Sequence, residues 1–412
     1  MPSKIIACSL PMSGHFALSV AEGIAAYVSR HPHLRLQIPG RIPFLPLPSI
    51  QDFQGDGVIG FFSSSEEIEP FRKHGVAVVN ISSFTDRIRP WVHINNRRIG
   101  ELAAESLCAQ GFRRFLYVDF LDMLEKNEDK EIEAWFSRER FSGFQDRLLE
   151  RDLGCETLRL HLSSFRHADA WKSGLERLGR QLRAQPRPLG IYCVNDNAAG
   201  LVLTACQQAG LRVPDEIAVI GTDNDSLICH GLTPSLSSIE QGPERIGWEA
   251  IRVMDGILNG TLQADTEISL DPLELVERES SATIHVDDPL VAEAVRLIRQ
   301  SLTDESLISA LPGRLGMSRR SLERRFKAVL SISPTQEMIR LRLQKVQREL
   351  LGTRRTIKEI AMNSGFCSAE HLQKQFRHRF GTSPDAWRKL NRPSGISRNR
   401  LLCGFGEPES AG

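Results

Sequence analysis

Two stretches of this chain, 50 residues apart, repeat one pattern of helix-forming residues. The first is SRRSLERRFKAVLSISP, from Ser318 to Pro334, and the second is SAEHLQKQFRHRFGTSP, from Ser368 to Pro384. In both, Leu follows the opening Ser by four positions and Phe follows it by eight, and a Ser-Pro pair closes the stretch. Residues four apart share one face of a helix, so each copy predicts a helix with one apolar stripe. The duplication therefore predicts two copies of one small helical unit.

Each of the two predicted helices is apolar on one side and polar, with many basic residues, on the other. The apolar stripe is Leu322, Phe326 and Val329 in the first helix, and Leu372, Phe376 and Phe380 in the second. The outward residues are Arg319, Arg320, Glu323, Arg324 and Lys327 in the first, and Ala369, Glu370, Gln373, Lys374 and Arg377 in the second. Ser318 and Ser368 stand where an N-cap accepts an early backbone N–H.

A short helix and a tight turn are predicted before each of these basic helices. Before Ser368, TIKEIAMNSGFC predicts a helix with Thr356 and Glu359 as a capping box, followed by a glycine turn. Before Ser318, LISALPGRLGM has the same role, although Pro312 interrupts it. A helix, a tight turn and a basic second helix form a helix-turn-helix, which places its second helix in the major groove of DNA.

One uninterrupted helix is predicted between the two units, from Thr335 to Leu351. At 1.5 Å per residue, roughly 17 residues span about 25 Å. Successive major grooves on one face of DNA lie about 34 Å apart. A spacer of this length would let the two units read successive major grooves, so double-stranded promoter DNA is the predicted partner.

The first 280 residues have a different pattern, in which short apolar runs alternate with amphipathic stretches. This alternation predicts an α/β fold with parallel sheets covered by helices on both faces, and the length allows two such sheets. No Gly-x-Gly-x-x-Gly turn follows the strands, which argues against a dinucleotide site. The predicted strands begin at Lys4, Asp56, Val76, Arg114, Leu189 and Ile217, and the predicted helices include 97–110, 136–150, 168–182 and 198–209.

Composition and charge divide the chain at the same place as the patterns do. LDPLELVERESSATIHVDDP, with two prolines and a polar middle, predicts a linker over 271–289. From Val286 onward there are 23 Lys and Arg against 13 Asp and Glu, whereas the remainder has 29 against 38. This asymmetry suggests that the C-terminal part meets a polyanion, although a solvated basic surface would have the same composition. The expected parts are 1–270, the linker, an all-α domain over 290–390 and a loose tail over 391–412.

Several classes of protein are disfavoured by what the sequence lacks. No apolar run approaches the ~20 residues of a membrane span, and MPSKIIACSL is typical of a first strand rather than a signal peptide. The eight cysteines are scattered without a Cys-x-x-Cys pair, which favours reduced thiols in a cytoplasm over disulfides. His161 and His167 have no apparent partners, so we expect no metal and no cofactor.

The two parts of the chain resemble two known families. MSRRSLERRFKAVLSISPTQEMIRLRLQKVQRELL and IKEIAMNSGFCSAEHLQKQFRHRFGTSPDAWRKL resemble the AraC/XylS DNA-binding domain over about 100 residues. INNRRIGELAAESLCAQGFRRFLYV, SRERFSGF and LGIYCVNDNAAGLVLTACQQAGLRVPDEIAVIGTDND resemble the LacI-type, periplasmic-binding-protein-like sugar sensor. A sensor of this type followed by such a reader is the arrangement of the XylR-like regulators. The resemblance implies a fold of two Rossmann-like subdomains with ligand in the cleft between them, followed by two helix-turn-helix units.

The resemblance also implies which residues bind the effector. Asp223 in TDND would hold a sugar hydroxyl, Asn195 and Asp196 in VNDN would form a pair at the cleft edge, and Arg140 in RERFSGF would lie in the cleft. Asn95 in INNRRIG stands where relatives usually carry an acidic residue, so its role is open. Charge-assisted hydrogen bonds suit sugar hydroxyls. Taken alone, Asp or Asn after a strand can simply cap a helix, and Arg140 can belong to a surface ion pair. The loop 11–16 is a further, weaker candidate.

The resemblance assigns the DNA contacts to the two repeated helices. Arg suits guanine, Gln suits adenine and Glu can accept from cytosine, whereas other contacts can be to phosphate alone. The simpler reading of exposed basic side chains is ordinary solvation. The matching positions are Arg319, Arg320, Glu323 and Arg324 in the first helix, and Ala369, Glu370, His371, Gln373 and Lys374 in the second.

We therefore expect a sugar-responsive transcription regulator, an activator that acts as a homodimer, with RNA polymerase as a partner and D-xylose as the family's default effector. A constitutive regulator with a degenerate sensor, or a regulator of another sugar operon, would share every reader residue. An enzyme using Asp196, Asp223 and Asp225 as paired carboxylates lacks an accompanying nucleophile elbow, phosphate loop or metal cluster. A free-standing binding protein for transport would need an export signal, which we do not find in this sequence, and would not need the attached reader.

Overall fold

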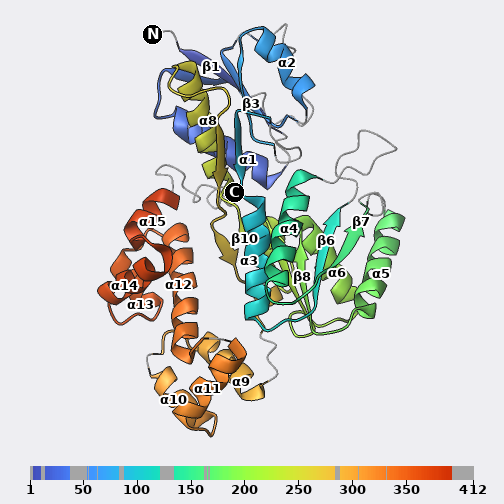
Figure 1. Cartoon of the computed structure of the whole chain (residues 1–412), viewed down its shortest axis with the longest axis vertical. Coiled ribbons are helices and arrows are strands. Elements are labelled where there is room, and N and C mark those ends of the chain that lie inside the picture. The colour runs from blue at the N-terminus through green and yellow to red at the C-terminus, as the bar shows by residue number, and fades with distance from the viewer. Residues whose placement is uncertain are drawn as a thin grey trace, which may run out of the picture.

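Parallel strands and covering helices form the first two-thirds of the molecule, and helices alone form the rest (Figure 1). The computed structural model describes residues 3–10, 14–37, 53, 55–62, 64–82, 88–120, 134–161, 165, 168–283, 288–304, 306–330 and 332–391. Within these ranges the expected fold class is confirmed: two α/β subdomains precede an all-helical region. None of the described helices is both long and apolar enough to cross a bilayer.

Each α/β subdomain is built on its own six-stranded sheet, and every strand pairing in them is parallel except that of β12 with β10. The first sheet has the order β11-β5-β4-β3-β1-β2, and the second has the order β12-β10-β9-β8-β6-β7. The strands of the first are β1 (Lys4–Ser9), β2 (Leu34–Gln37), β3 (Gly57–Gly60), β4 (Ala77–Asn80), β5 (Trp91–Ile94) and β11 (Glu267–Leu270). Those of the second are β6 (Phe115–Phe120), β7 (Glu156–Leu160), β8 (Leu189–Cys193), β9 (Ile217–Thr222), β10 (Ser237–Glu240) and β12 (Glu274–Val276).

All six predicted strands are present, as β1, β3, β4, β6, β8 and β9, and each is largely buried. The chain crosses between the subdomains three times: after β5, after β10 and after β11. The helices of the two subdomains are α1 (His15–Val28), α2 (Ser65–Lys73), α3 (Asn96–Ala109), α4 (Trp135–Leu149), α5 (Ala168–Ala184), α6 (Asp196–Gln208), α7 (Ser226–Gly231) and α8 (Pro243–Leu258). The four helices predicted in this region correspond to α3, α4, α5 and α6.

Two glycines bring α3 and α4 into backbone contact. A Cβ added at Gly100 would lie 1.9 Å from the carbonyl oxygen of Arg140, and one at Gly143 would lie 2.0 Å from that of Arg97. No larger residue fits at either position unless the helices move apart. Because α4 carries Arg140, this contact fixes that side chain relative to the start of α3. The same arrangement recurs where α1 meets α8, at Gly23 and Gly247.

Replacing Gly100 with alanine is expected to lower the free energy of unfolding by at least about 2 kcal/mol, since the added methyl group meets backbone rather than a movable side chain. Urea unfolding followed by circular dichroism measures this loss. Gly154→Ala is the matched control, because nothing lies within 4 Å of a Cβ at that position. Equal stability of the two variants would contradict the close packing of α3 against α4.

The helical region, here called the reader, contains both repeated units. Its helices are α9 (Pro289–Gln300), α10 (Leu307–Arg314), α11 (Arg319–Leu330), α12 (Pro334–Gly352), α13 (Ile357–Asn363), α14 (Ala369–Phe380) and α15 (Pro384–Asn391). The predicted stripes pack inward, with Leu322 and Phe326 in one core and Leu372 and Phe376 in another. The predicted spacer is α12, which contributes Met338 and Leu341 to the first core and residues from Leu343 onward to the second.

The predicted helix caps of the reader are present. The Ser318 hydroxyl accepts from the Ser321 N–H and the Ser368 hydroxyl accepts from the His371 N–H, both at 3.2 Å. Thr356 and Glu359 form the expected capping box before α13. The Ser-Pro pairs open the following helices, since Ser333 caps α12 and the Ser383 hydroxyl accepts from the Ala386 N–H at 3.2 Å.

The stretch expected to be a linker is folded over much of its length. Strand β12 and a 3-10 turn at Glu279–Ser281 lie within 271–289, and β12 pairs with β10 in the second sheet. The Ser280 hydroxyl, fully buried, donates to the carbonyl of Val219 at 2.7 Å. The Ser281 hydroxyl donates to the Ser237 hydroxyl at 2.8 Å, so these two serines are satisfied inside the second subdomain, whereas the composition of the stretch alone is typical of a linker.

Candidate functional site

Asp223 lies in a strained loop at the carboxyl end of β9. Its φ is 115°, and that of the following Asn224 is 50°, both in a region that residues other than glycine seldom adopt. The N–H of Asp223 donates to the carbonyl of Ile239 at 3.1 Å. Gln241, which follows β10, donates its side-chain N–H to the Asp223 carboxylate. The surrounding structure therefore holds this carboxylate in place against the cost of the backbone conformation, as functional sites often do.

Arg140 is buried in the second subdomain, with 4% of its surface exposed. Its Nε donates to Oδ1 of Asn96 at 2.9 Å, and its Nη1 donates to the carbonyl of Val194 at 2.6 Å. The guanidinium lies 4.9 Å from the centre of the Phe136 ring, as in a cation–π contact. These contacts join the starts of α3 and α4 to the end of β8, so the position of Arg140 is fixed before any ligand binds.

The charges around Asp223 belong to both subdomains. Burial raises the pKa of the Asp223 carboxyl to about 6, although Arg140, the hydrogen bond from Gln241 and the charge of His15 oppose this shift. His15 is the first residue of α1 in the first subdomain, whereas Arg140 and Asp223 belong to the second. We call Arg140, Asp223, Asn96, Gln241 and His15 the effector cluster. It offers a carboxylate, a guanidinium and amides, which suit the hydroxyl groups of a polyol.

Two of the predicted effector residues have structural roles in this arrangement. The Asn195 side chain caps α6 by accepting from the Ala198 N–H at 2.9 Å. Asp196 is fully buried and accepts from the Ser238 hydroxyl at 2.6 Å and from the Asp225 N–H at 2.8 Å. Burial, followed by the charge of Asp223, raises the pKa of Asp196 well above its usual range. Asp196 therefore holds the loop that carries Asp223 in place, through its hydrogen bond with the Asp225 N–H.

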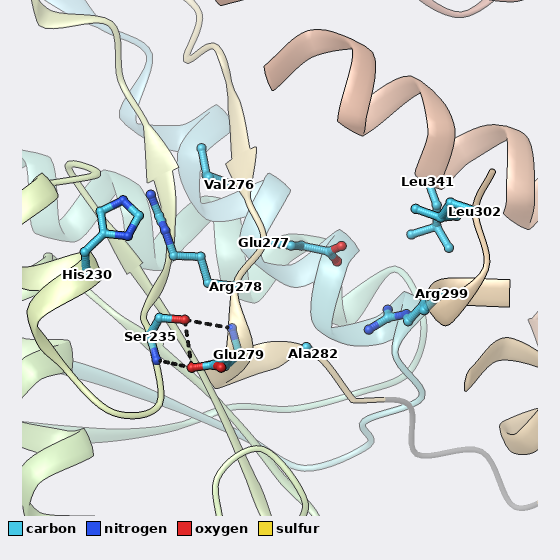
Figure 2. Close-up of a pocket in the computed structure, with 10 residues that line it drawn as sticks. All are labelled: His230, Ser235, Val276, Glu277, Arg278, Glu279, Ala282, Arg299, Leu302 and Leu341. Atoms are coloured by element: carbon cyan, nitrogen blue, oxygen red, sulfur yellow. Dashed lines mark hydrogen bonds between the residues drawn. The ribbon is translucent and has the colours of Figure 1, made fainter. Parts of the chain in front are cut away.

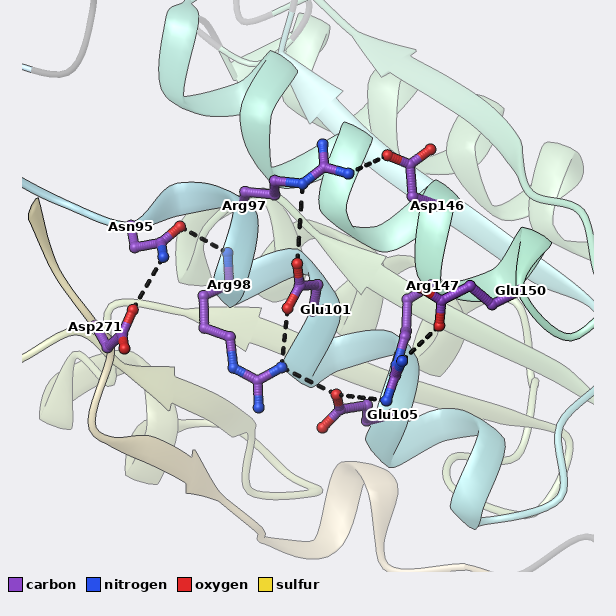
Figure 3. A network of polar contacts seen from close by, with 9 residues as sticks. All are labelled: Asn95, Arg97, Arg98, Glu101, Glu105, Asp146, Arg147, Glu150 and Asp271. Carbon is purple, nitrogen blue, oxygen red and sulfur yellow. Dashed lines mark hydrogen bonds and ion pairs between the residues drawn. The ribbon is translucent and has the colours of Figure 1, made fainter.

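Asn95 lies at a crossover between the subdomains, beside Asp271 (Figure 3). Its side chain caps α3 by accepting from the Arg98 N–H at 3.1 Å, and it donates to Asp271, beyond β11, at 2.9 Å. Arg245, at the start of α8, donates to the carbonyl of Asp271 at 3.3 Å. Asn95 thus links two segments that cross between the subdomains, the one after β5 and the one after β11. The neighbouring Asn96 makes the contact with Arg140. The ion pairs drawn in Figure 3 then continue along α3 and α4, through Arg97, Arg98, Glu101, Glu105, Asp146, Arg147 and Glu150.

The polar side of α11 is open to solvent, as its pattern predicts. Arg319, Arg320, Glu323 and Arg324 are all exposed, and Arg319 pairs with Glu323 at 3.0 Å. An open hollow of about 570 Å³ runs along this side of the helix. Arg320 and Arg324 stand one turn apart on the helix and both line the hollow. Its lining is Ser318, Arg320, Ser321, Glu323, Arg324 and Lys327.

The polar side of α14 is exposed at Glu370, Gln373 and Lys374. A hydrogen bond with Ser368 lowers the pKa of Glu370, so its ionised carboxylate is stabilised at the N-terminus of the helix. Ala369 and His371 are half-buried. The His371 Nδ1 lies 3.2 Å from the thiol of Cys367, and its ring packs edge-on against Phe366. His371 therefore contacts the turn before its own helix, whereas Gln373 and Lys374 are open to solvent.

Sequence reasoning did not identify Asn96, Gln241 and Phe136 as neighbours of Arg140 and Asp223. Gln241 follows a short strand, and Phe136 has no motif of its own. Asn96 stands beside Asn95 in INNRRIG, and the periodicity of the helix does not distinguish the two. His15 lies within the loop 11–16 named as a weaker candidate, of which residues 11–13 lie outside the described residues.

Each of the two parts of the chain matches a known protein family. The periplasmic binding protein-like domain matches residues 104–281, and a helix-turn-helix domain matches residues 312–390. The xylose operon regulatory protein of Haemophilus influenzae is 27% identical over 345 residues, which cover 82% of this chain and 86% of that protein. Its counterpart in Escherichia coli K12 is 26% identical over 354 residues, covering 84% and 86%.

A solved structure has the same fold along nearly the whole chain. The structure of the xylose-binding transcription activator xylR superposes with a TM-score of 0.58 and 23% sequence identity. The match covers 95% of this chain and 99% of that one. The order of the parts, a binding-protein-like domain followed by a helix-turn-helix domain, is therefore common to this chain and its relatives.

Proposed function

We propose a sugar-controlled switch for this chain, which is an XylR-like transcription regulator: a periplasmic-binding-protein-like domain followed by an AraC-type helix-turn-helix domain, homologous to the xylose operon regulatory proteins. A chain of this kind regulates transcription and is not an enzyme. In the proposal, the two α/β subdomains form a sensor that binds the effector between them, and the reader binds promoter DNA.

The observation that carries the sensor's role is that the buried Asp223 carboxyl is acted on by the charge of Arg140 and by that of His15, which belongs to the other subdomain. A sugar hydroxyl can donate to the Asp223 carboxylate while a neighbouring oxygen accepts from a cationic or amide group. A ligand held from both subdomains favours their closed arrangement, because only that arrangement makes both sets of contacts. D-xylose, or another pentose of similar shape, is the first candidate because the relatives named above regulate a xylose operon.

The exposed side of α11 and that of α14 support the reader's role. In the proposal, Arg320 and Arg324 contact base edges, Arg319 and Glu323 contact the backbone or select against wrong bases, and Gln373 reads adenine. Lys374 contacts phosphate, and Ala369, Glu370 and His371 border the same groove. At 1.5 Å per residue, the 19 residues of α12 extend about 28 Å between the two units. This spacing is compatible with two successive major grooves, about 34 Å apart.

The remaining parts of the proposal concern assembly and output. We expect a homodimer that activates transcription through contact with RNA polymerase. We assign the sensor to residues up to 281, because β12 pairs with β10, and the reader to 290–390. Asn95 and Asp196 are proposed to support the site and its crossovers, without direct contact with the sugar. The alternative is a constitutive regulator whose sensor binds no sugar.

Thermal unfolding of the full-length protein against pentoses, hexoses and sugar acids tests the proposal. A ligand that binds only the folded state adds about 2.7 kcal/mol at 100 times its Kd, which raises the unfolding temperature measurably. We expect a pentose to give the largest shift. A shift in unfolding temperature with another sugar alone would support the switch and identify that sugar as the effector. No shift with any sugar, in a protein that still binds DNA, would favour the constitutive alternative.

A further inference from the structure

A cavity of about 560 Å³ lies between the sensor and the reader, and residues of both parts line it. In Figure 2 the side chain of Glu277, just beyond β12, extends toward the reader, whereas Arg278 turns back into the sensor. The reader contributes Arg299 of α9, Leu302 and Leu341 of α12. Two consecutive residues of one segment therefore face two different parts of the molecule.

Arg278 is tied to the loop that carries Asp223. Its Nη2 donates to Oδ1 of Asn224 at 2.7 Å, and its Nη1 donates to the carbonyl of Leu236 at 2.9 Å. Asn224 directly follows Asp223, and its own amide donates to Glu240 at 3.0 Å. Because Asn224 is held on both sides, a rotation of the loop at Asp223 must move the group that Arg278 binds. A change at the effector cluster thereby reaches the segment beside the reader.

The carboxylate of Glu277 interacts electrostatically with the reader. Burial tends to lower the pKa of Arg340 on α12, but its hydrogen bonds to Glu337, and then the charges of Glu337 and Glu277, raise that pKa above the usual value. Among the described residues, the one hydrogen bond found for the Glu277 carboxylate comes from Gln110 at 3.4 Å, which is long. Glu277 therefore attracts the reader electrostatically without a close ion pair.

Arg299 lines the same cavity and has unsatisfied donors. Its Nε and Nη2 atoms are buried and have no hydrogen-bond partner among the described residues. These two atoms form one edge of the guanidinium, the edge that can bind both oxygens of a carboxylate. Buried unpaired donors are costly, so an arrangement that supplies a carboxylate here is favoured. Glu277 is the carboxylate of the sensor that extends toward this side of the cavity.

We propose that Glu277 and Arg278 together couple the effector cluster to the reader. Arg278 moves together with the loop at Asp223 and Asn224. Glu277 then either attracts Arg340 from a distance or forms an ion pair with the unpaired Nε and Nη2 atoms of Arg299. These two pairings correspond to two orientations of the reader, and sugar binding shifts the balance between them. This inference rests on the proposed function, because it requires both a sugar and a DNA site.

The test compares DNA affinity with and without the sugar identified by thermal unfolding, on a duplex that the full-length protein selects from a random pool. Couplings of this kind typically change affinity about 5- to 150-fold. Glu277→Gln is expected to reduce the change to about twofold or less, while the affinity for sugar alone stays within about threefold of the wild type. Arg296→Gln is the matched control, because Arg296 is an exposed arginine on the same helix as Arg299 and pairs with Glu293.

A charge exchange separates coupling from a loss of packing. Arg299→Gln is expected to reduce the response as Glu277→Gln does. The double variant Glu277→Arg with Arg299→Glu is expected to recover part of it, since the pair with position 299 is rebuilt in reverse while the attraction to Arg340 is lost. A wild type that responds to sugar, with all these variants responding equally, would overturn the inference and leave the proposed function intact. A wild type that binds DNA equally with and without sugar would overturn both.

Discussion

Replacing Asp223 with alanine is expected to weaken sugar binding at least ~100-fold, because charge-assisted hydrogen bonds to a carboxylate contribute about 1.5–3 kcal/mol each and two are lost. The variant also removes a negative charge that interacts with Arg140. Isothermal titration with the effector measures the loss. Asp223→Asn keeps the shape of the side chain and is expected to lose most of the affinity too. Asp215→Asn, at an exposed acid of the same subdomain, is the control.

The pH dependence of binding gives an independent check of the same residue. Burial raises the pKa of Asp223 to about 6, and the sugar is proposed to bind the ionised carboxylate. Affinity for the sugar is then constant above that pKa and falls about tenfold for each pH unit below it. If the affinity for the sugar stays constant down to about pH 4.5, or if Asp223→Asn binds the sugar as tightly as the wild type, Asp223 does not bind the sugar.

Removing Arg320 and Arg324 is expected to abolish sequence-specific DNA binding without affecting sugar binding. Each bidentate contact with a base contributes about 1–3 kcal/mol of discrimination, so each single alanine variant should lose roughly 10- to 100-fold in specific affinity and the double variant more. Both side chains are exposed and line the hollow on α11, so their removal leaves the core residues Leu322 and Phe326 in place. Fluorescence anisotropy with the selected duplex measures the loss.

Two comparisons make this second prediction specific. Arg180→Ala, at an exposed arginine of the sensor helix α5, removes the same charge far from the reading helices and should keep full DNA affinity. Varying the salt separates base contacts from phosphate contacts, since losing a phosphate contact also reduces the dependence of binding on salt. If sugar binding falls together with DNA binding in the double variant, misfolding explains the loss better than missing base contacts do.

The parts of the fold that could be predicted from sequence are those whose signal is local. The apolar stripes of α11 and α14, their serine caps and the capping box before α13 each depend on residues within one helical turn. The six predicted strands are continuous apolar runs. By contrast, β2, β5, β10, β11 and β12 have few consecutive apolar residues, with polar or charged ones beside them, and β7 is largely exposed, so their pairing depends on neighbours far away in the sequence.

The site was harder to predict because a polar residue after a strand has several possible uses. Asn195 and Asp223 both follow a strand, yet the Asn195 side chain caps a helix, whereas the Asp223 carboxylate accepts from Gln241 and interacts with the charge of Arg140. Asp196 is buried because Ser238 and the Asp225 N–H satisfy it, and Ser238 lies 42 residues away. Resemblance points to the loops that carry Asn195 and Asp223, whereas the packing of α3 against α4 brings Asn96, and not Asn95, into hydrogen-bond contact with Arg140.

The central claim, that the sensor controls the reader, is tested most directly by one affinity measurement at constant salt. Full-length protein is titrated onto the selected duplex with and without saturating effector, alongside the Asp223→Ala variant. We predict that the effector changes the wild-type Kd for DNA at least about fivefold and leaves the variant unchanged. A wild type that binds both the sugar and the duplex, with the same Kd for DNA in both conditions, would contradict the account.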